Sequence, residues 1–137
     1  MNASAEPDSS KESKPARDVI LEKAEAYAHA VYAIARKLPK DELFGITSQL
    51  KRASLSVPLN LVEGHARQSA KSRSQFLKIS YGSLKESQFI IKFCVDEKLL
   101  TRDDCAPVYK LGEQLAKLIW KKTQTIESST IATKGFK

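Results

Sequence analysis

The sequence is poor in the residues and motifs on which most catalytic and metal sites depend. Its 137 residues include two histidines, two cysteines and five glycines. The cysteines, Cys94 and Cys105, do not form a CxxC pair, and the His and Cys residues are too few for a typical metal site. The sequence also lacks a glycine-rich phosphate loop and a nucleophile elbow. We therefore expect a protein that is not an enzyme and that uses no metal and no cofactor.

The histidines do not match the patterns of known helical enzymes. Di-iron bundles use Glu-x-x-His, whereas Glu25 and His29 are one residue further apart. HEPN-type ribonucleases place an arginine a short, fixed distance before the catalytic histidine, and neither His29 nor His65 has an arginine there. A ribonuclease activity that depends on His65 therefore has no support in the sequence.

Long hydrophobic runs are missing as well. No segment is long and apolar enough to cross a membrane, and none near the N-terminus resembles a signal peptide. We therefore expect a cytoplasmic protein with no membrane partner, in which Cys94 and Cys105 are reduced. The alternative for the cysteines is a disulfide across a helix–helix turn.

Positive charge exceeds negative charge in this chain. It has 23 Lys and Arg residues against 16 Asp and Glu residues, a formal net charge of +7. A small basic protein is compatible with a polyanionic partner, most often nucleic acid. The same charge could instead serve only to keep the protein soluble, and the charge alone does not decide between the two.

Apolar residues recur at three- and four-residue steps, which is the helical period. The pattern predicts four helices, over residues 18–38, 42–64, 72–97 and 101–127. Short connections between long amphipathic helices indicate an all-α fold, an antiparallel up-down-up-down four-helix bundle. We expect Asp41 to cap the second helix and Gly64 to end it. Residues 1–17 and 128–137 are predicted to be a disordered N-terminal extension and a flexible C-terminal tail.

The third predicted helix has a seam in which small residues alternate with large ones. Its heptad positions are Leu77, Ser80, Leu84, Ser87, Ile91 and Cys94. Small side chains let a neighbouring helix approach closely, and a serine hydroxyl can bond back to the previous turn of its own helix. We expect Gly82 and Ser83 to serve the same purpose.

Several ordered motifs of the predicted bundle carry a family resemblance. They are Leu38-Pro39-x-x-Glu42-x-Phe44-Gly45, Gln49-Leu50-x-Arg52-Ala53-Ser54-x-Ser56-Val57-Pro58-x-Asn60, Glu63-Gly64-x-x-Arg67, and Phe76-Leu77 followed by Gly82-Ser83-Leu84-x-Glu86. Over residues 19–122 the sequence resembles the bacterial four-helix-bundle proteins first met as reading frames in 23S rRNA intervening sequences, which are often labelled S23 ribosomal proteins.

This resemblance implies an assembly and partners that the residues alone do not indicate. Several members of the family form homopentamers, a ring or barrel with a central channel. A related branch, the accessory variability determinant of diversity-generating retroelements, has a basic surface, binds nucleic acid and contacts a reverse transcriptase. By resemblance we expect a homo-oligomer, with a pentamer as the expected size, and a reverse transcriptase is a candidate partner.

The best candidate for a binding surface is a lysine stripe on the third predicted helix. Lys71, Lys78, Lys85 and Lys92 are seven residues apart, and each such step rotates a straight helix by only about 20°. The four amines therefore follow one flank of the helix, where they could contact phosphates. Arg73 adds positive charge near the start of the helix. The alternative is an ordinary solvated face of a bundle helix.

Further basic residues are second choices for the same role. They are Lys51, Arg52 and Arg67. Arg52 could equally form an ion pair with an acidic neighbour. Trp120, which two lysines follow, could stack on a base or lie at a subunit seam or a bundle end.

Together these features predict a non-enzymatic basic scaffold or accessory protein that self-associates and binds RNA or DNA. The alternative is a purely structural or protein-interaction homo-oligomer whose basic charge is incidental. The two differ in one observable property, because only the first has a salt-sensitive affinity for nucleic acid.

Overall fold

The structure, a computed structural model, describes residues 18–135, which contain helices and turns but no strand. The α-helices are α2 (Val19–Ala35), α3 (Ser48–His65), α4 (Ala70–Asp96) and α5 (Arg102–Gly135). A 3-10 turn, η2 (Lys40–Glu42), and a π-helical turn, η3 (Leu43–Thr47), connect α2 to α3. The disordered extension predicted over residues 1–17 lies outside the described residues.

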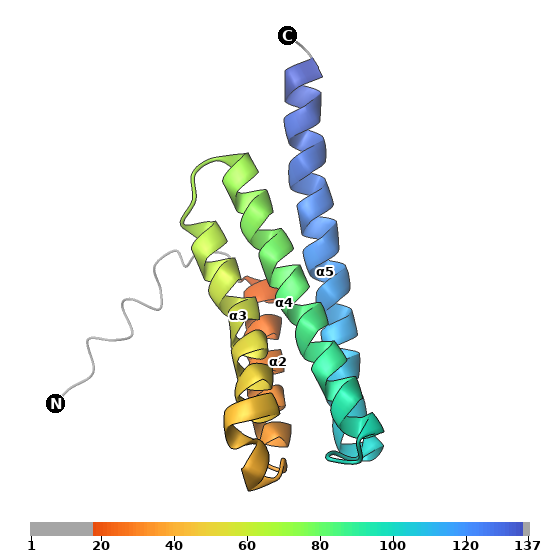
Figure 1. Ribbon diagram of the computed structural model, residues 1–137. Coiled ribbons are helices and arrows are strands. Elements are labelled where there is room, and N and C mark those ends of the chain that lie inside the picture. Colours follow the sequence, from red (N-terminus) through yellow and green to blue (C-terminus); the bar gives the residue numbers. More distant parts are fainter. Residues whose placement is uncertain (1–17, 136–137) are drawn as a thin grey trace, which may run out of the picture.

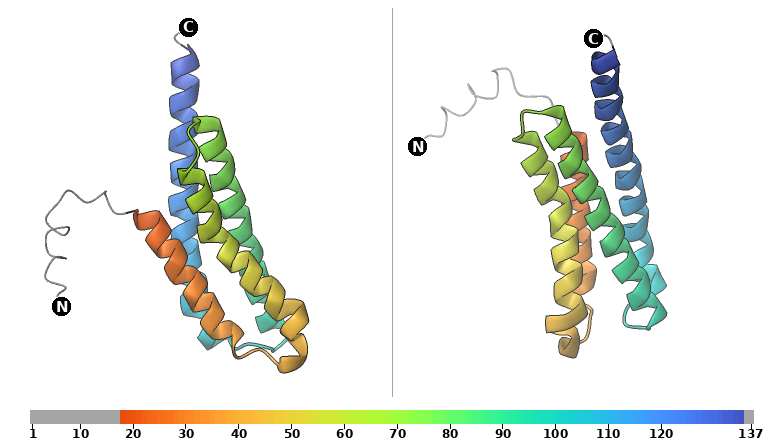
Figure 2. Two further views of the ribbon diagram at one scale, coloured as in Figure 1. Left: turned by 90° about the vertical axis from the view of Figure 1, so that its left-hand side faces the viewer. Right: turned by 45° about the horizontal axis from the view of Figure 1, so that its top comes forward.

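The four helices pack side by side as a bundle (Figure 1). α3 packs against α2 and α4, and α5 packs against α4 and α2, so the four helices enclose one core. Successive helices run in opposite directions and are joined by short turns (Figures 1 and 2). The all-α class and the four-helix bundle are therefore confirmed. α5 extends past the other helices at one end of the bundle.

Side-chain caps explain where three of the helices begin. The carboxylate of Asp18 accepts a hydrogen bond from the backbone N–H of Leu21 at 3.0 Å, and α2 follows. Ser69 accepts from the N–H of Ser72 at 3.1 Å at the start of α4, and Thr101 accepts from the N–H of Asp104 at 3.1 Å at the start of α5. Each cap satisfies an amide that has no partner within its helix.

The predicted start of the second helix and the roles expected of Asp41 and Gly64 are wrong, whereas its predicted end near Gly64 agrees with the end of α3 at His65. Asp41 lies inside η2 and does not cap a long helix, and Gly45 has non-helical dihedrals (φ −109°, ψ −108°), so the regular helix α3 begins only at Ser48. Gly64 lies inside α3 and is buried, and no glycine of residues 18–135 has a positive φ. A Cβ added at Gly64 would lie 3.1 Å from Cβ of Phe76. Gly64 therefore allows close approach of α3 and α4.

The C-terminal boundary of the bundle also differs from the prediction. α5 continues to Gly135, so the predicted end of the last helix at residue 127 is wrong. Extending an existing helix adds one hydrogen bond for each residue fixed and needs no new nucleus. The hydroxyl of Thr130 also donates to the carbonyl of Ile126 at 3.0 Å.

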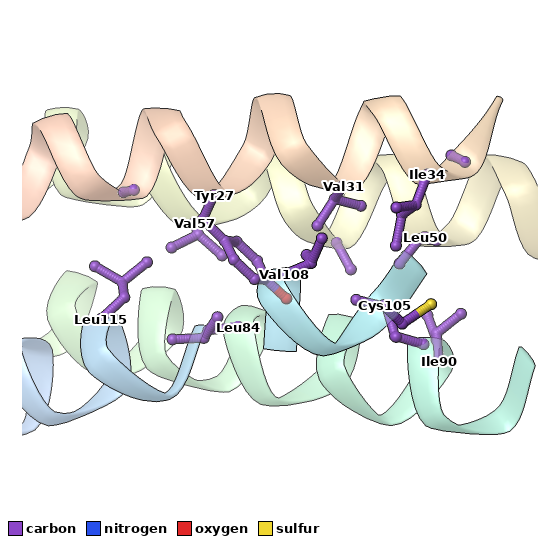
Figure 3. Packing of buried hydrophobic residues seen from close by; sticks show 14 of the residues in the cluster. Tyr27, Val31, Ile34, Leu50, Val57, Leu84, Ile90, Cys105, Val108 and Leu115 are labelled. Atoms are coloured by element: carbon purple, nitrogen blue, oxygen red, sulfur yellow. The ribbon is translucent and has the colours of Figure 1, made fainter. Parts of the chain in front are cut away.

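The core is built from one face of each helix (Figure 3). Tyr27 of α2, Val57 of α3, Leu84 of α4 and Leu115 of α5 are fully buried. All six heptad positions predicted in the third helix are buried in α4, which confirms the seam. Cys94 belongs to this seam, and both it and Cys105 are buried free thiols, so the alternative disulfide is not formed.

Ser87 donates back to the carbonyl of Leu84 in the previous turn at 2.7 Å, as expected, whereas two other serines of α4 bond to a neighbouring helix, which the sequence does not predict. Ser80 donates to the carbonyl of Val57 in α3 at 2.8 Å, and Ser83 shares a hydrogen bond of 2.8 Å with Ser56 of the same helix. Gly82 is expected to allow a neighbouring helix to approach closely, and within one copy of the chain it does not. Gly82 is exposed, and no atom would lie within 4 Å of an added Cβ.

Candidate nucleic-acid interface

The lysine stripe lies along the edge of α4 that faces α5. Nζ of Lys78 is 2.6 Å from a carboxylate oxygen of Glu127, and Nζ of Lys85 is 3.2 Å from one of Glu113, so two ion pairs join α4 to α5. Lys92 pairs with Asp96 of its own helix at 2.7 Å. Lys71 has no ion pair within residues 18–135. Carboxylates thus partly neutralise three of the four stripe lysines.

Three hollows follow the seam between α4 and α5, with volumes of about 650, 310 and 410 Å³. The stripe lines them from α4, and Arg102, Lys110 and Lys117 line them from α5. Seven basic side chains and the three acidic partners named above surround the hollows, an excess of four positive charges. We call this seam with its seven basic residues the basic groove.

Lysine partners lower the pKa values of the two acidic residues that α5 contributes to the groove. The hydrogen bond from Lys85 is the main cause that lowers the pKa of Glu113. The hydrogen bond from Lys78, followed by that from Ser74 at 2.7 Å, lowers the pKa of Glu127. All four partners of these two ion pairs are well exposed to solvent, and exposed pairs contribute little to stability. A phosphate that enters the groove can therefore replace a carboxylate as the partner of a lysine.

An aromatic pair lies in the middle of the basic groove. The ring centroids of Tyr81 and Trp120 are 5.5 Å apart, and the ring planes are inclined by 50°. Nζ of Lys85 lies 5.7 Å from the centroid of the Tyr81 ring. Trp120 is 55% exposed although it is a large apolar side chain. The structure therefore brings Trp120 beside the lysine stripe.

The remaining predicted residues do not line the basic groove. Lys51 lies over the ring of Tyr32 at 5.1 Å, between α3 and α2. Arg67 pairs with Glu63 at 3.2 Å and lies 4.9 Å from the ring centroid of Phe76. The guanidinium group of Arg73 donates to the carbonyl of Gln68 at 2.8 Å. Lys51, Arg67 and Arg73 therefore contact other parts of the bundle, away from the basic groove.

Arg52 differs from the other second choices. Its side chain is exposed, and among the described residues it forms no ion pair, so the acidic neighbour expected as an alternative is not present there. It lies on α3 and does not line the basic groove.

Sequence reasoning missed the residues that α5 contributes to the groove. Arg102, Lys110 and Lys117 do not follow a single regular spacing, and no sequence pattern marks them as a set. They become a set because α5 packs antiparallel to α4 at one particular register. That register depends on packing between the helices. The only signal in the sequence is the seven-residue step from Lys110 to Lys117, which matches the step of the stripe.

Six large apolar side chains of α3 and α4 are exposed, and one of them, Ile79, also lines the first hollow of the groove. On α3 they are Leu55, Leu59 and Val62, whose spacing places them on one side of the helix. On α4 they are Ile79, Phe89 and Phe93. We call these six residues the exposed apolar set. Phe44 of η3, part of a motif noted above, is 94% exposed as well.

The described part of the chain contains neither a candidate metal site nor a candidate membrane-spanning helix. No group of three or more His, Cys, Asp or Glu side chains is placed to hold a metal ion there. No helix within residues 18–135 is long and apolar enough to cross a membrane.

Comparisons with known proteins agree with the fold. The model of the 23S rRNA-intervening sequence protein family matches residues 17–121. A crystal structure of a protein of unknown function from the S23 ribosomal protein family of Bacteroides thetaiotaomicron is similar, with a TM-score of 0.72 and 18% sequence identity. The similarity covers 77% of this chain and 98% of the other. No curated protein matches the chain in sequence.

Proposed function

The chain belongs to the family of 23S rRNA-intervening sequence proteins, and from this premise we propose that it is a non-enzymatic, self-associating protein of the cytoplasm that binds nucleic acid. The observation that carries the proposal is the basic groove. Its two rows of cations come from α4 and α5, with an excess of four positive charges. The free thiols Cys94 and Cys105 are consistent with a reducing compartment.

The chemistry of the groove suits a phosphate backbone. Lysines in exposed ion pairs can exchange a carboxylate for a phosphate at little cost. Each phosphate that is neutralised releases counterions, so the logarithm of the affinity falls linearly with the logarithm of the salt concentration. The slope is about 0.7 to 0.9 per phosphate, depending on the strand form.

The test is fluorescence anisotropy of labelled RNA, duplex DNA and an RNA–DNA hybrid across a salt series. We expect binding with a slope of several units, and we expect Lys78→Glu/Lys85→Glu to weaken it strongly. Arg36→Glu/Lys40→Glu makes the same change in charge at exposed residues outside the groove and is the matched control. Equal losses in the two variants would show that binding follows net charge and not the groove. No binding at about 50 mM salt, where the electrostatic contribution is strong, would refute the nucleic-acid function.

The exposed apolar set favours the second candidate, a purely structural or protein-interaction homo-oligomer. Large apolar side chains clustered at a surface often mark a protein interface. Self-association is part of both candidates, and the expected pentamer comes from the family resemblance. Only the nucleic-acid function needs the basic groove to be open in the assembly.

A reverse transcriptase is the protein partner that the resemblance to retroelement accessory proteins suggests. A reverse-transcriptase gene beside the gene for this chain, and co-purification of the two proteins, would support that partner.

A further inference from the structure

The middle hollow of the basic groove combines aromatic and cationic surface. Its volume is about 310 Å³, and its lining residues are Tyr81, Lys85, Glu113, Ala116, Lys117 and Trp120. Ala116 is buried, whereas Trp120 is 55% exposed. The hollow is therefore a small apolar surface flanked by charge, on the bundle seam and not in the core.

The aromatic pair is available for a planar partner. Tyr81 and Trp120 pack at 5.5 Å in an inclined arrangement, and the exposed part of the Trp120 ring has no other aromatic neighbour among the described residues. An exposed indole offers a stacking surface to any nucleobase, because every base has a π-face.

The cations are placed to hold the phosphates beside such a base. Lys85 lies 5.7 Å from the centroid of the Tyr81 ring and pairs with Glu113 at 3.2 Å. Lys117 lines the same hollow and is close enough to contribute to the lowered pKa of Glu113. Both amines therefore border the aromatic surface, and Lys85 can exchange Glu113 for a phosphate.

We propose that this hollow binds an unpaired base of single-stranded nucleic acid, stacked on Trp120, with the flanking phosphates on Lys85 and Lys117. The inference rests on the proposed nucleic-acid function and names its ligand class. In a duplex the base faces are covered by their neighbours in the stack, whereas a single strand can turn a base outward. The protein therefore prefers a single strand to a duplex of the same length.

Trp120 is the only tryptophan of the chain, so its emission reports on this hollow alone. The experiment titrates the full chain with labelled oligouridine and with duplex RNA of equal length, and follows label anisotropy and Trp120 emission together. We expect the single strand to quench Trp120 and to protect it from acrylamide, and the duplex to do neither. Binding seen by anisotropy with unchanged Trp120 emission would overturn the stacking inference and leave the proposed function standing. No binding of either strand form would remove both.

A set of variants separates stacking from other roles of Trp120. We expect Trp120→Leu to lower affinity for the single strand about ten-fold and to leave duplex affinity unchanged. Trp120→Phe keeps a ring and should restore most of that loss. Phe44→Leu removes an exposed aromatic side chain outside both the groove and the exposed apolar set and should change nothing. Circular dichroism of each variant checks that the bundle is folded.

Two outcomes of the variants would contradict the inference. One is an equal loss of affinity for single strand and duplex in Trp120→Leu. The other is acrylamide protection of Trp120 that rises with protein concentration before any RNA is added, because a second copy of the chain would then cover the indole.

Discussion

Gly112 of α5 is buried where α5 meets α2 and α4. A Cβ added there would lie 2.7 Å from Nε2 of Gln88 and 2.9 Å from Cε1 of Tyr27. Neither neighbour can move freely, because Tyr27 is fully buried with its hydroxyl 2.7 Å from Oγ of Ser87, and Gln88 donates to the carbonyl of Tyr109 at 3.3 Å. Gly82 is the opposite case, since an added Cβ would meet nothing within 4 Å.

We therefore predict opposite effects for the same substitution at these two glycines. Gly112→Ala should lower the free energy of unfolding by about 1–3 kcal/mol, because overpacking outweighs the gain in helix propensity. Gly82→Ala should raise it by up to about 1 kcal/mol, the propensity gain alone. Denaturant unfolding at one protein concentration measures both values. A loss in Gly82→Ala would instead indicate that Gly82 contacts a neighbouring subunit.

At the scale of the helices, the ion pairs between α4 and α5 make the stability of the bundle depend on pH. The pKa values of Glu113 and Glu127 are lowered in the folded protein by their lysine partners. Their contribution is therefore present above the ordinary pKa of glutamate, and it is lost as the pH falls through the lowered values. Asp104 behaves in the same way, because the hydrogen bond from Lys37 at 3.1 Å lowers its pKa.

The double variant Glu113→Gln/Glu127→Gln tests what these pairs do for the groove. The stability of this variant should fall less than that of the unmodified protein when the pH is lowered. Denaturant midpoints measured from neutral to acidic pH test this. The double variant should also strengthen nucleic-acid binding, because the loss of two carboxylates raises the positive charge of the groove. The salt slope should stay nearly unchanged, because the same lysines contact phosphates in both proteins. Asp103→Asn, an exposed acidic residue outside the groove, is the control. Unchanged affinity in the double variant would show that these lysines do not contact the ligand.

Periodicity predicts the interior of each helix better than its ends. The seam of α4 follows from its heptad residues, because burial of one face is a property of the helix itself. The start of α3 cannot be predicted from periodicity, because Gly45 and the π-helical turn depend on how the chain enters the bundle. Gly64 shows the same limit, since a glycine in the sequence does not tell a C-cap from a close helix contact.

The candidate site was predictable only in part for a similar reason. The lysine stripe follows from its spacing along one helix. The ion pairs with Glu113 and Glu127, the contact of Tyr81 with Trp120 and the contribution of Lys117 depend on the register between two helices. The sequence contains no local signal for that register.

At the scale of the whole molecule, the exposed apolar set makes self-association testable. We predict that Leu59→Glu/Phe93→Glu converts the assembly to a folded monomer, because buried unpaired carboxylates are costly at an apolar interface. Native mass spectrometry measures the number of subunits, which the resemblance gives as five for the unmodified chain. Val19→Glu, at an exposed apolar residue of α2 outside the set, should leave the assembly intact. A monomeric unmodified protein would refute self-association.

The overhang of α5 gives the molecule two unequal ends. One end carries the α2–α3 and α4–α5 connections, and at the other end α5 continues past the α3–α4 turn (Figure 1). Copies related by one rotation axis along the bundle would place every overhang on the same side. Such a ring would have a front and a back. A strand or a partner protein that meets it would find a different surface on each side, so its approach would have a direction.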